Sequence, residues 1–543
     1  MTRRIFEKRQ LLLAVCLLSA IFMLPFAEAA EKGGTIIEAI QTEPTNLNTL
    51  KAARRPEMTV LHLMFEPLFT VNKKLEIEPL LVDSYKVSAD GLTWTLKMKP
   101  GINFHDGSPL NAEAVKFSLE KIQTGTQGIR ISAIKEIKIV DNMTIDILLK
   151  QPYPVFLTAL SNPNVMIFSK VAYEKNPQDW GSKVLSGTGP LMFVEWKSGD
   201  RVIMKRNPAY KHGPSFVTNK GPAHADEWII RFIPEQATLI GELTSGEVDL
   251  SDYVSERDID RIKNSKDADV IVDKSTVAVY ININCSSENK PFNDPKMRSA
   301  LCHSVNTEAV RRAALNNVAD PLYTYISPQT MGFSEASVAI AKPLVEYAPD
   351  KAKAILEELG WKDAGKGYRE KDGAPLEVEF LAFNMPMFKR IAEVTAPMLE
   401  KAGFKVNLKI LEAGDLYERV LKGNHDLLAT SLVVSSGVAL DDLVATLHSK
   451  NIGTIMQWAH YKNPEMDELL DTALYEIDDA KRKSALLKVQ ELAARDVVCI
   501  PIANAKEIFG YKKTIGGVEN YKTHPWAYNQ ADMTRALELF KKK

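Results

Sequence analysis

The chain has 543 residues, a formal net charge of −1, 45% hydrophobic residues and 25% charged residues. These values are typical of a globular protein and exclude a disordered chain. The balanced charge does not favour binding to nucleic acid or to an anionic membrane. A chain of this length is too long for one hydrophobic core and predicts two or three domains.

The N-terminus predicts export. Basic residues at positions 3–9 precede an apolar run from Leu11 to Phe26, and Ala27-Glu28-Ala29 has small residues where a signal peptidase reads the chain. The apolar stretch is about 16 residues long, shorter than the roughly 20 that a membrane-spanning helix needs. We therefore expect residues 1–29 to be a signal peptide that is cleaved after Ala29.

Three cysteines remain after this cleavage, because Cys16 lies inside the apolar run. They are Cys285, Cys302 and Cys499. An odd number allows at most one internal disulfide. A Cys285–Cys302 bond would suit an oxidising compartment, but the sequence does not establish it.

The first half of the chain predicts short strands, hairpins and one capped helix. Trp94, Leu96 and Met98 alternate with polar residues, which indicates a half-buried strand over 92–99. Asn111 is placed to cap a helix. The further expected elements are strands at 33–40, 137–139, 145–147, 191–196, 201–206 and 228–233, and a helix at 236–244.

The second half predicts an α/β lobe. The expected strands lie at 277–284, 377–383, 405–411 and 497–503, and the expected helices at 295–304, 387–402, 464–475 and 479–495. Asp350 is expected to cap a further helix that ends at Gly360. The strand–helix–strand order around residues 377–411 indicates parallel pairing.

An ordered set of motifs resembles a known family. The motifs are Phe65-Glu66-Pro67-Leu68, residues 88–96, Phe104-His105-Asp106-Gly107, Gly187-Thr188-Gly189-Pro190, Pro291-Phe292-Asn293-Asp294 and residues 298–301. Together they resemble the extracellular solute-binding protein family 5, the periplasmic receptors of peptide and nickel ABC importers. The resemblance covers essentially the whole chain after residue 29.

The resemblance implies an α/β, two-lobed periplasmic-binding-protein fold (class II, cluster C type) with an extra α/β domain inserted in the N-terminal lobe. Two crossing strands would join the lobes, and we expect them near Val277–Asn284 and Ile500–Ile508. The expected boundaries are 30–60, 185–277 and 510–543 for the first lobe, 61–184 for the inserted domain, and 283–505 for the second lobe.

The resemblance also implies a receptor that is not an enzyme. It would be a periplasmic monomer without a cofactor, would capture a peptide or peptide-like solute between its lobes, and would deliver it to a membrane ABC permease and its ATPase. Receptors for a nickel or metal chelate, for another organic solute, or for signalling stay open as alternatives. Residues 360–366 have the P-loop spacing, but Gly367 stands where that motif needs Ser or Thr.

The family's peptide receptors place an acid in a D-x-P-D-N-F loop, which corresponds here to residues 437–443. Ala439 and Leu440 replace the first acid and the proline, whereas Asp441 matches the second acid and Asp442 follows it. This pair could bind a cation or could cap a helix. The arginine that holds a peptide carboxylate in dipeptide receptors is replaced by Ala382, with Asn384 close by.

Other candidate ligand contacts are basic or aromatic. Arg54 and Arg55 suit a carboxylate ligand, although solvated surface is the alternative. His448 and His460 flank Trp458, so a chelated metal could be held by histidine and stacked on the indole, with surface histidines as the alternative. The arginine and tryptophan that nickel receptors carry before the 137–139 strand are absent from residues 123–128.

Overall fold

The structure is a computed structural model that describes residues 33–52, 54–74, 76–252, 254–286, 288–289, 291–433, 437–454, 456–521 and 534–542. The expected signal peptide and its cleavage site lie outside these residues. Within the described ranges, no helix is both long and apolar enough to cross a membrane.

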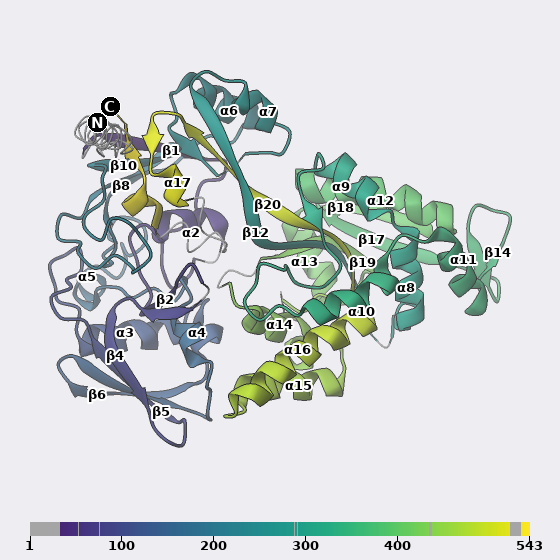
Figure 1. Cartoon of the computed structure of the whole chain (residues 1–543), viewed down its shortest axis with the longest axis horizontal. Coiled ribbons are helices and arrows are strands. Elements are labelled where there is room, and N and C mark those ends of the chain that lie inside the picture. Colours follow the sequence, from purple (N-terminus) through teal and green to yellow (C-terminus); the bar gives the residue numbers. More distant parts are fainter. Residues whose placement is uncertain are drawn as a thin grey trace, which may run out of the picture.

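Two long strands join two lobes (Figure 1). They are β12 (Ala268–Ile283) and β20 (Cys499–Lys512), which pair antiparallel from Ala268 opposite Lys512 to Asn282 opposite Cys499. The crossing strands expected from the sequence fall within this pair. Strand β12 begins nine residues earlier than expected, because residues 268–274 also pair with β20, on the first-lobe side.

In the first lobe, β1 (Thr35–Ile40) lies parallel to β10 (Glu227–Phe232), and β9 (Arg201–Arg206) and β8 (Leu191–Lys197) follow antiparallel. Strand β11 (Leu250–Ser251) links β1 to β20. One sheet of eleven strands therefore runs through both lobes. The helices of this part are α2 (Arg55–Leu61), α6 (Gln236–Ser245), α7 (Ile259–Lys263) and α17 (Val518–Tyr521), with small strands β21 (Ile515–Gly516) and β22 (Phe540–Lys541).

A separate four-stranded sheet forms the lower part of the same half in Figure 1. Its strands, in spatial order, are β4 (Val82–Val87), β5 (Thr93–Met98), β7 (Thr144–Leu149) and β6 (Ile134–Asp141). Helix α3 (Ala112–Gln123) begins as expected, with the Asn111 side chain accepting from the Ala114 amide at 2.9 Å. The neighbouring elements are β2 (Phe69–Val71), β3 (Ile77–Pro79), α4 (Phe156–Leu160) and α5 (Lys170–Lys175).

This four-stranded sheet and the first lobe share one continuous hydrophobic cluster. Trp94 of β5 belongs to it, is 4% exposed, and packs edge-on against Phe156 with ring centroids 5.6 Å apart. The boundaries of an inserted domain at 61–184 therefore stay a prediction, because packing alone does not separate it from the first lobe.

The second lobe contains the parallel unit expected from the sequence. Strand β17 (Glu377–Phe383) pairs parallel with β18 (Lys405–Leu411) and with β19 (Leu427–Val433), which pairs antiparallel with β12. Helix α12 (Pro386–Ala402) connects β17 to β18 and ends at Gly403, whose φ of 102° requires glycine.

Helices surround this second-lobe sheet. They are α8 (Pro295–Ser304), α9 (Thr307–Ala314), α10 (Glu335–Val345), α11 (Pro349–Glu358), α13 (Ala413–Leu421), α14 (Ala439–Leu447), α15 (Pro464–Tyr475) and α16 (Asp479–Asp496). Short elements complete it: β13 (Asp320–Pro321), β14 (Lys362–Asp363), β15 (Arg369–Lys371), β16 (Ala374–Pro375) and η2 (Ser449–Asn451).

Two local expectations were wrong, and one open question is answered. Asp350 does not cap α11, because Ala348 is the N-cap and Pro349 starts the helix, which leaves Asp350 in the first turn. Val497 is not in a strand, because α16 continues to Asp496 and Val497 ends it with a left-handed φ of 49°. The sequence left open whether Cys285 and Cys302 pair, and in the structure both of these cysteines are free thiols.

A fully buried ion pair fixes the C-terminal segment to the central strand of the first lobe. Glu38 of β1 and Arg535 are both 0% exposed, and their side chains lie 3.1 Å apart. The Trp228 indole donates to Glu38 Oε2 at 2.8 Å, and Arg535 Nη2 donates to the Thr59 carbonyl at 2.8 Å. Removing one partner would leave a buried charge without its counter-charge.

We therefore predict that Glu38→Ala lowers the free energy of unfolding by about 3–5 kcal/mol. The control is Glu227→Ala on the adjacent strand, a half-buried carboxylate that accepts from Thr35 Oγ1 at 3.1 Å and should cost no more than about 1 kcal/mol. Urea denaturation measures both, and equal losses for the two variants would contradict the prediction.

Two of the sequence motifs meet at a second buried carboxylate. Glu66 accepts hydrogen bonds from Thr188 Oγ1 at 2.7 Å and from the Tyr210 hydroxyl at 2.8 Å, and it pairs with His212 Nε2 at 2.8 Å. Burial alone would raise the pKa of Glu66, but the His212 charge and these hydrogen bonds lower it. Nearby, His105 Nε2 bonds the Gly189 carbonyl at 3.0 Å, and removal from water lowers the pKa of His105 to about 4.

Because the folded His105 pKa lies below the unfolded value of 6.5, the unfolded state binds more protons between pH 4 and 6.5, and stability falls as the pH falls through this window. Substituting His105→Gln keeps a donor and an acceptor but does not titrate. We predict that the pH slope of unfolding free energy decreases by up to about 1.4 kcal/mol per pH unit in this window. The prediction would be wrong if the unfolding free energies of the unmutated protein and of His105→Gln changed equally with pH in this window.

Candidate functional site

The two lobes contact each other away from the crossing strands. Val438 and Leu440 at the start of α14, and Leu474 of α15, belong to the same hydrophobic cluster as the first-lobe core. The Tyr475 ring lies 5.9 Å from the Tyr153 ring, and its hydroxyl bonds the Gln151 side chain. The structure therefore describes an arrangement in which the lobes meet, and we call this contact region the interlobe boundary.

The two adjacent arginines behave differently. Arg55 forms an ion pair with Asp252 of its own lobe. Arg54 is exposed and lies at the N-cap of α2, and its backbone N–H donates to Glu57 Oε2 at 2.9 Å. Burial raises the pKa of Tyr417 in the second lobe, and the Arg54 charge opposes that increase, so the charge of Arg54 acts on a residue of the other lobe.

Three aromatic side chains of the second lobe, one of which is Tyr417, pack against one another, and we call them the aromatic trio. Phe383 at the end of β17 lies 5.6 Å from Tyr417 of α13 and 6.2 Å from Trp458, and Tyr417 and Trp458 are 6.3 Å apart. The Trp458 indole N–H is buried and has no hydrogen-bond partner among the described residues. A buried donor without a partner is costly, which makes it a candidate ligand contact.

Asn384 follows Phe383 at the end of β17 and is exposed. Its side-chain amide donates to Glu412 Oε1 at 2.7 Å. Asn384 thus adjoins the aromatic trio, which includes Trp458, and the Arg54 charge acts on Tyr417 of that trio; their roles as ligand contacts stay a prediction.

Asp441 and Asp442 lie in the first turn of α14 and do not cap it, because Val438 is the N-cap. Asp442 is 5% exposed. Burial raises the pKa of Asp441 to about 6 and that of Asp442 to about 7, and the Arg130 charge opposes both shifts. The capping alternative is therefore wrong.

Arg130 is a candidate residue that the sequence analysis missed. It lies in η1 (Gly128–Ile131), which precedes β6, and its Nε donates to Gln127 Oε1 at 2.9 Å. Gln127 Nε2 in turn donates to the Ala52 carbonyl at 3.1 Å, so Arg130 lies beside the loop that carries Arg54. The loop before β6 extends beyond residues 123–128, because β6 begins only at Ile134.

The two histidines have separate surroundings. His448 is 6% exposed and pairs with Asp467 at 3.0 Å and Asp471 at 3.4 Å, so it is not a surface residue. His460 Nε2 lies 2.7 Å from the Val420 carbonyl. Across the described part of the chain, no group of three His, Cys, Asp or Glu side chains is arranged to hold a metal ion.

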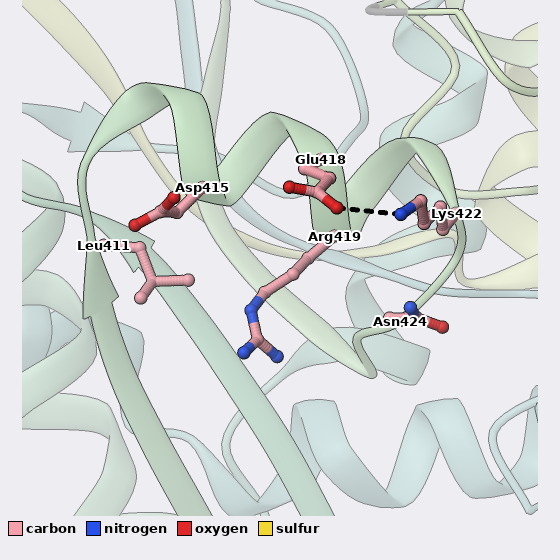
Figure 2. Close-up of a pocket in the computed structure, with 6 residues that line it drawn as sticks. All are labelled: Leu411, Asp415, Glu418, Arg419, Lys422 and Asn424. Carbon is pink, nitrogen blue, oxygen red and sulfur yellow. Dashed lines mark hydrogen bonds and ion pairs between the residues drawn. The ribbon is translucent and has the colours of Figure 1, made fainter.

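A surface hollow of about 370 Å³ lies on the other side of α13 (Figure 2). Asp415, Glu418, Arg419 and Lys422 project into it, whereas Leu416 and Val420 of the same helix face the core. Lys422 pairs with Glu418 at 2.8 Å, and Arg419 pairs with Glu379 at 3.1 Å. Because three of these four charged side chains already have ion-pair partners, the hollow offers no strong case for a ligand site.

Two α/β lobes joined by two crossing strands, with charged and aromatic side chains where the lobes meet, define a two-lobed solute-binding protein. The model of the bacterial extracellular solute-binding proteins, family 5 Middle, matches residues 76–454. The chain therefore belongs to this family, whose members are binding proteins rather than enzymes and work with ABC transporter permeases.

Individual relatives are distant but match over almost their full length. The glutathione-binding protein GsiB of Escherichia coli K12 is 25% identical over 517 residues, which cover 93% of this chain and 96% of GsiB. The oligopeptide-binding protein AppA of Bacillus subtilis, solved with a nonapeptide, gives a TM-score of 0.78 at 23% identity and 95% and 100% coverage. DppA of Helicobacter pylori, solved with the peptide STSA, gives 0.77 at 22% identity and 94% and 99% coverage.

The Tyr475–Tyr153 contact predicts how the lobes respond to mutation. An aromatic pair contributes about 0.5–1.5 kcal/mol, so Tyr475→Ala should lower the ratio of closed to open protein by about 2- to 13-fold. Tyr475→Phe keeps the ring and should have a smaller effect. Single-molecule fluorescence transfer between dyes on Lys86→Cys and Lys353→Cys measures the ratio, and an unchanged distribution for Tyr475→Ala would show that the contact does not hold the lobes together.

Proposed function

We propose that this protein is the substrate-binding component of an ABC importer, and that it captures a peptide or peptide-like small solute between its lobes. It acts as a periplasmic monomer and passes the solute to a membrane permease that is driven by an ATPase. Family membership supports the transport role. The glutathione bound by GsiB and the peptides bound by AppA and DppA support a peptide-like ligand.

One observation carries the proposal: the interlobe boundary has complementary chemistry on its two sides. The first-lobe side contributes the arginines Arg54 and Arg130, and the second-lobe side contributes the aromatic trio and the two aspartates of α14. A solute that contacts both sides gains all of these interactions only when the lobes meet. Its differential affinity then shifts the protein toward the closed state.

The alternatives make different demands. A metal chelate would need ligating side chains or an organic chelator, and the candidate histidines already have protein partners: His460 bonds a backbone carbonyl and His448 pairs with two carboxylates. A signalling role would use the same lobes to report the solute to a membrane sensor. Neighbouring permease and ATPase genes favour import, and a neighbouring sensor gene favours signalling.

Ligand binding is tested first by a thermal-shift screen with glutathione, di- to pentapeptides and nickel chelates, because a ligand at 100 times its Kd adds ~2.7 kcal/mol of stability. We expect a peptide-like probe to stabilise the protein. A shift with a nickel chelate and with no peptide-like probe would overturn the proposed ligand class.

The aromatic trio is tested by Trp458→Ala, which removes the ring and the unpartnered N–H. We predict a loss of about 10- to 30-fold in affinity for the best peptide-like probe, measured by calorimetry, because buried tryptophans dominate binding energetics. Trp458→Phe should lose less, and Tyr347→Ala, an exposed site 45% open to solvent, should lose nothing. Unchanged affinity for Trp458→Ala would remove the trio from the site.

A further inference from the structure

Residues 457–461 carry one member of the aromatic trio, and we call them the tryptophan loop. Hydrogen bonds hold this loop at successive residues. The Gln457 side chain closes the loop, because its Nε2 donates to the Tyr461 carbonyl at 2.7 Å. The backbone N–H of Cys285, which follows β12, donates to the Ala459 carbonyl at 2.6 Å. The three loop residues in these bonds are at most 3% exposed, so water does not compete for them.

His425 bonds the tryptophan loop at the backbone of Trp458. It lies between α13 and β19, is 3% exposed, and its Nε2 is 3.1 Å from the Trp458 carbonyl. Burial lowers the pKa of His425 to about 3, so at neutral pH the ring is uncharged and carries one N–H. Because a carbonyl can only accept, this N–H is at Nε2, which donates to Trp458.

The other ring nitrogen of His425 shows what the imidazole contributes. His425 Nδ1 is buried and has no hydrogen-bond partner in the part of the chain that the structure describes. A buried polar atom without a partner is costly, and an apolar side chain of similar volume would avoid this cost. In return, the ring provides its bond to the Trp458 carbonyl, so its contribution is specific to the tryptophan loop.

A second histidine ties the loop to the helix that carries Tyr417. His460 has a left-handed φ of 45°, a conformation that costs energy for any residue with a side chain. Its Nε2 lies 2.7 Å from the carbonyl of Val420, near the end of α13. Both histidines therefore hold the loop against the α13–β19 connection, beside the aromatic trio.

We propose that His425 is a positioning residue, which holds the backbone of Trp458 so that the indole ring keeps one orientation before the solute arrives. The Trp458 N–H, which has no partner among the described residues, is then ready to donate to an acceptor on the solute. A side chain that is ordered beforehand loses less freedom on binding, which favours binding by about 2- to 13-fold. The inference rests on the proposed function and adds a residue that need not touch the solute.

Affinity is the first test. The probe is the tightest binder among glutathione and di- to pentapeptides, measured by calorimetry. His425→Leu should weaken its binding by about 2- to 13-fold. His425→Gln keeps an N–H donor and should restore part of the loss. In a Trp458→Ala background, His425→Leu should have no further effect, because His425 acts through the indole.

The second test observes Trp458 directly in the free protein. Fluorine NMR of protein labelled with fluorotryptophan gives one signal for each tryptophan, and Trp458→Phe identifies the signal of Trp458. His425→Leu should shift or broaden this signal. The matched control is His303→Leu in the same lobe, since His303 is fully buried and its Nδ1 lies 2.7 Å from the Glu346 carbonyl. It should lower the melting temperature but change neither the affinity nor the Trp458 signal.

The outcomes separate this inference from the proposed function. Unchanged affinity or an unchanged Trp458 signal in His425→Leu, or an equal loss of affinity with and without the indole, overturns the positioning role and leaves the proposed function intact. If the unmutated protein binds no peptide-like probe, both are overturned.

Discussion

The pairing of β12 with β20 is the constraint on which the rest of the structure depends. These two strands carry the sheet from one lobe to the other, and their ladder is interrupted between Lys274 and Ala278. There, the Asn504 side-chain amide donates to the Ser275 carbonyl at 2.9 Å and to the Val277 carbonyl at 3.0 Å. A bulge bends its strand locally, and the Asn504 amide gives these two backbone carbonyls the partner that the interrupted ladder does not supply.

This constraint determines which residues reach the interlobe boundary. Because one sheet runs through both lobes, the segments that follow its strands approach one another: Arg54 follows β1, Phe383 ends β17, and α14 follows β19. Ligands of α/β proteins commonly bind at such carboxyl ends of strands. Arg130 reaches the boundary from a different sheet, through the hydrogen bonds of Gln127 to Ala52 and to Arg130 itself.

The sequence was sufficient for features that depend on local chemistry. The alternation of apolar and polar residues predicted β5, Asn111 predicted the start of α3, and Gly403 predicted the end of α12. Each of these features depends on only a few neighbouring residues. The resemblance of the motifs predicted the family. The motif residues do not identify the ligand site, because residues such as Glu66 have structural roles in a buried hydrogen-bond network.

The candidate site was harder to predict from the sequence, because its residues interact with partners that lie far away along the chain. Arg54 and Arg55 are adjacent and chemically alike, yet only the fold shows that Arg55 pairs with Asp252 and that the charge of Arg54 acts on Tyr417. Arg130 was missed because the 3-10 helix η1 lengthens the loop before β6, so that Arg130 lies beyond residues 123–128. The surface alternative for His448 was wrong because its aspartate partners lie on a later helix, α15, and no motif links them to it in the sequence.

The central claim is that two lobes close on a solute around the crossing strands. Small-angle scattering with and without saturating glutathione tests it most directly. The account predicts a smaller radius of gyration and a shorter maximum dimension with the solute bound. The same scattering curve for the free protein and for every bound peptide-like probe would contradict it.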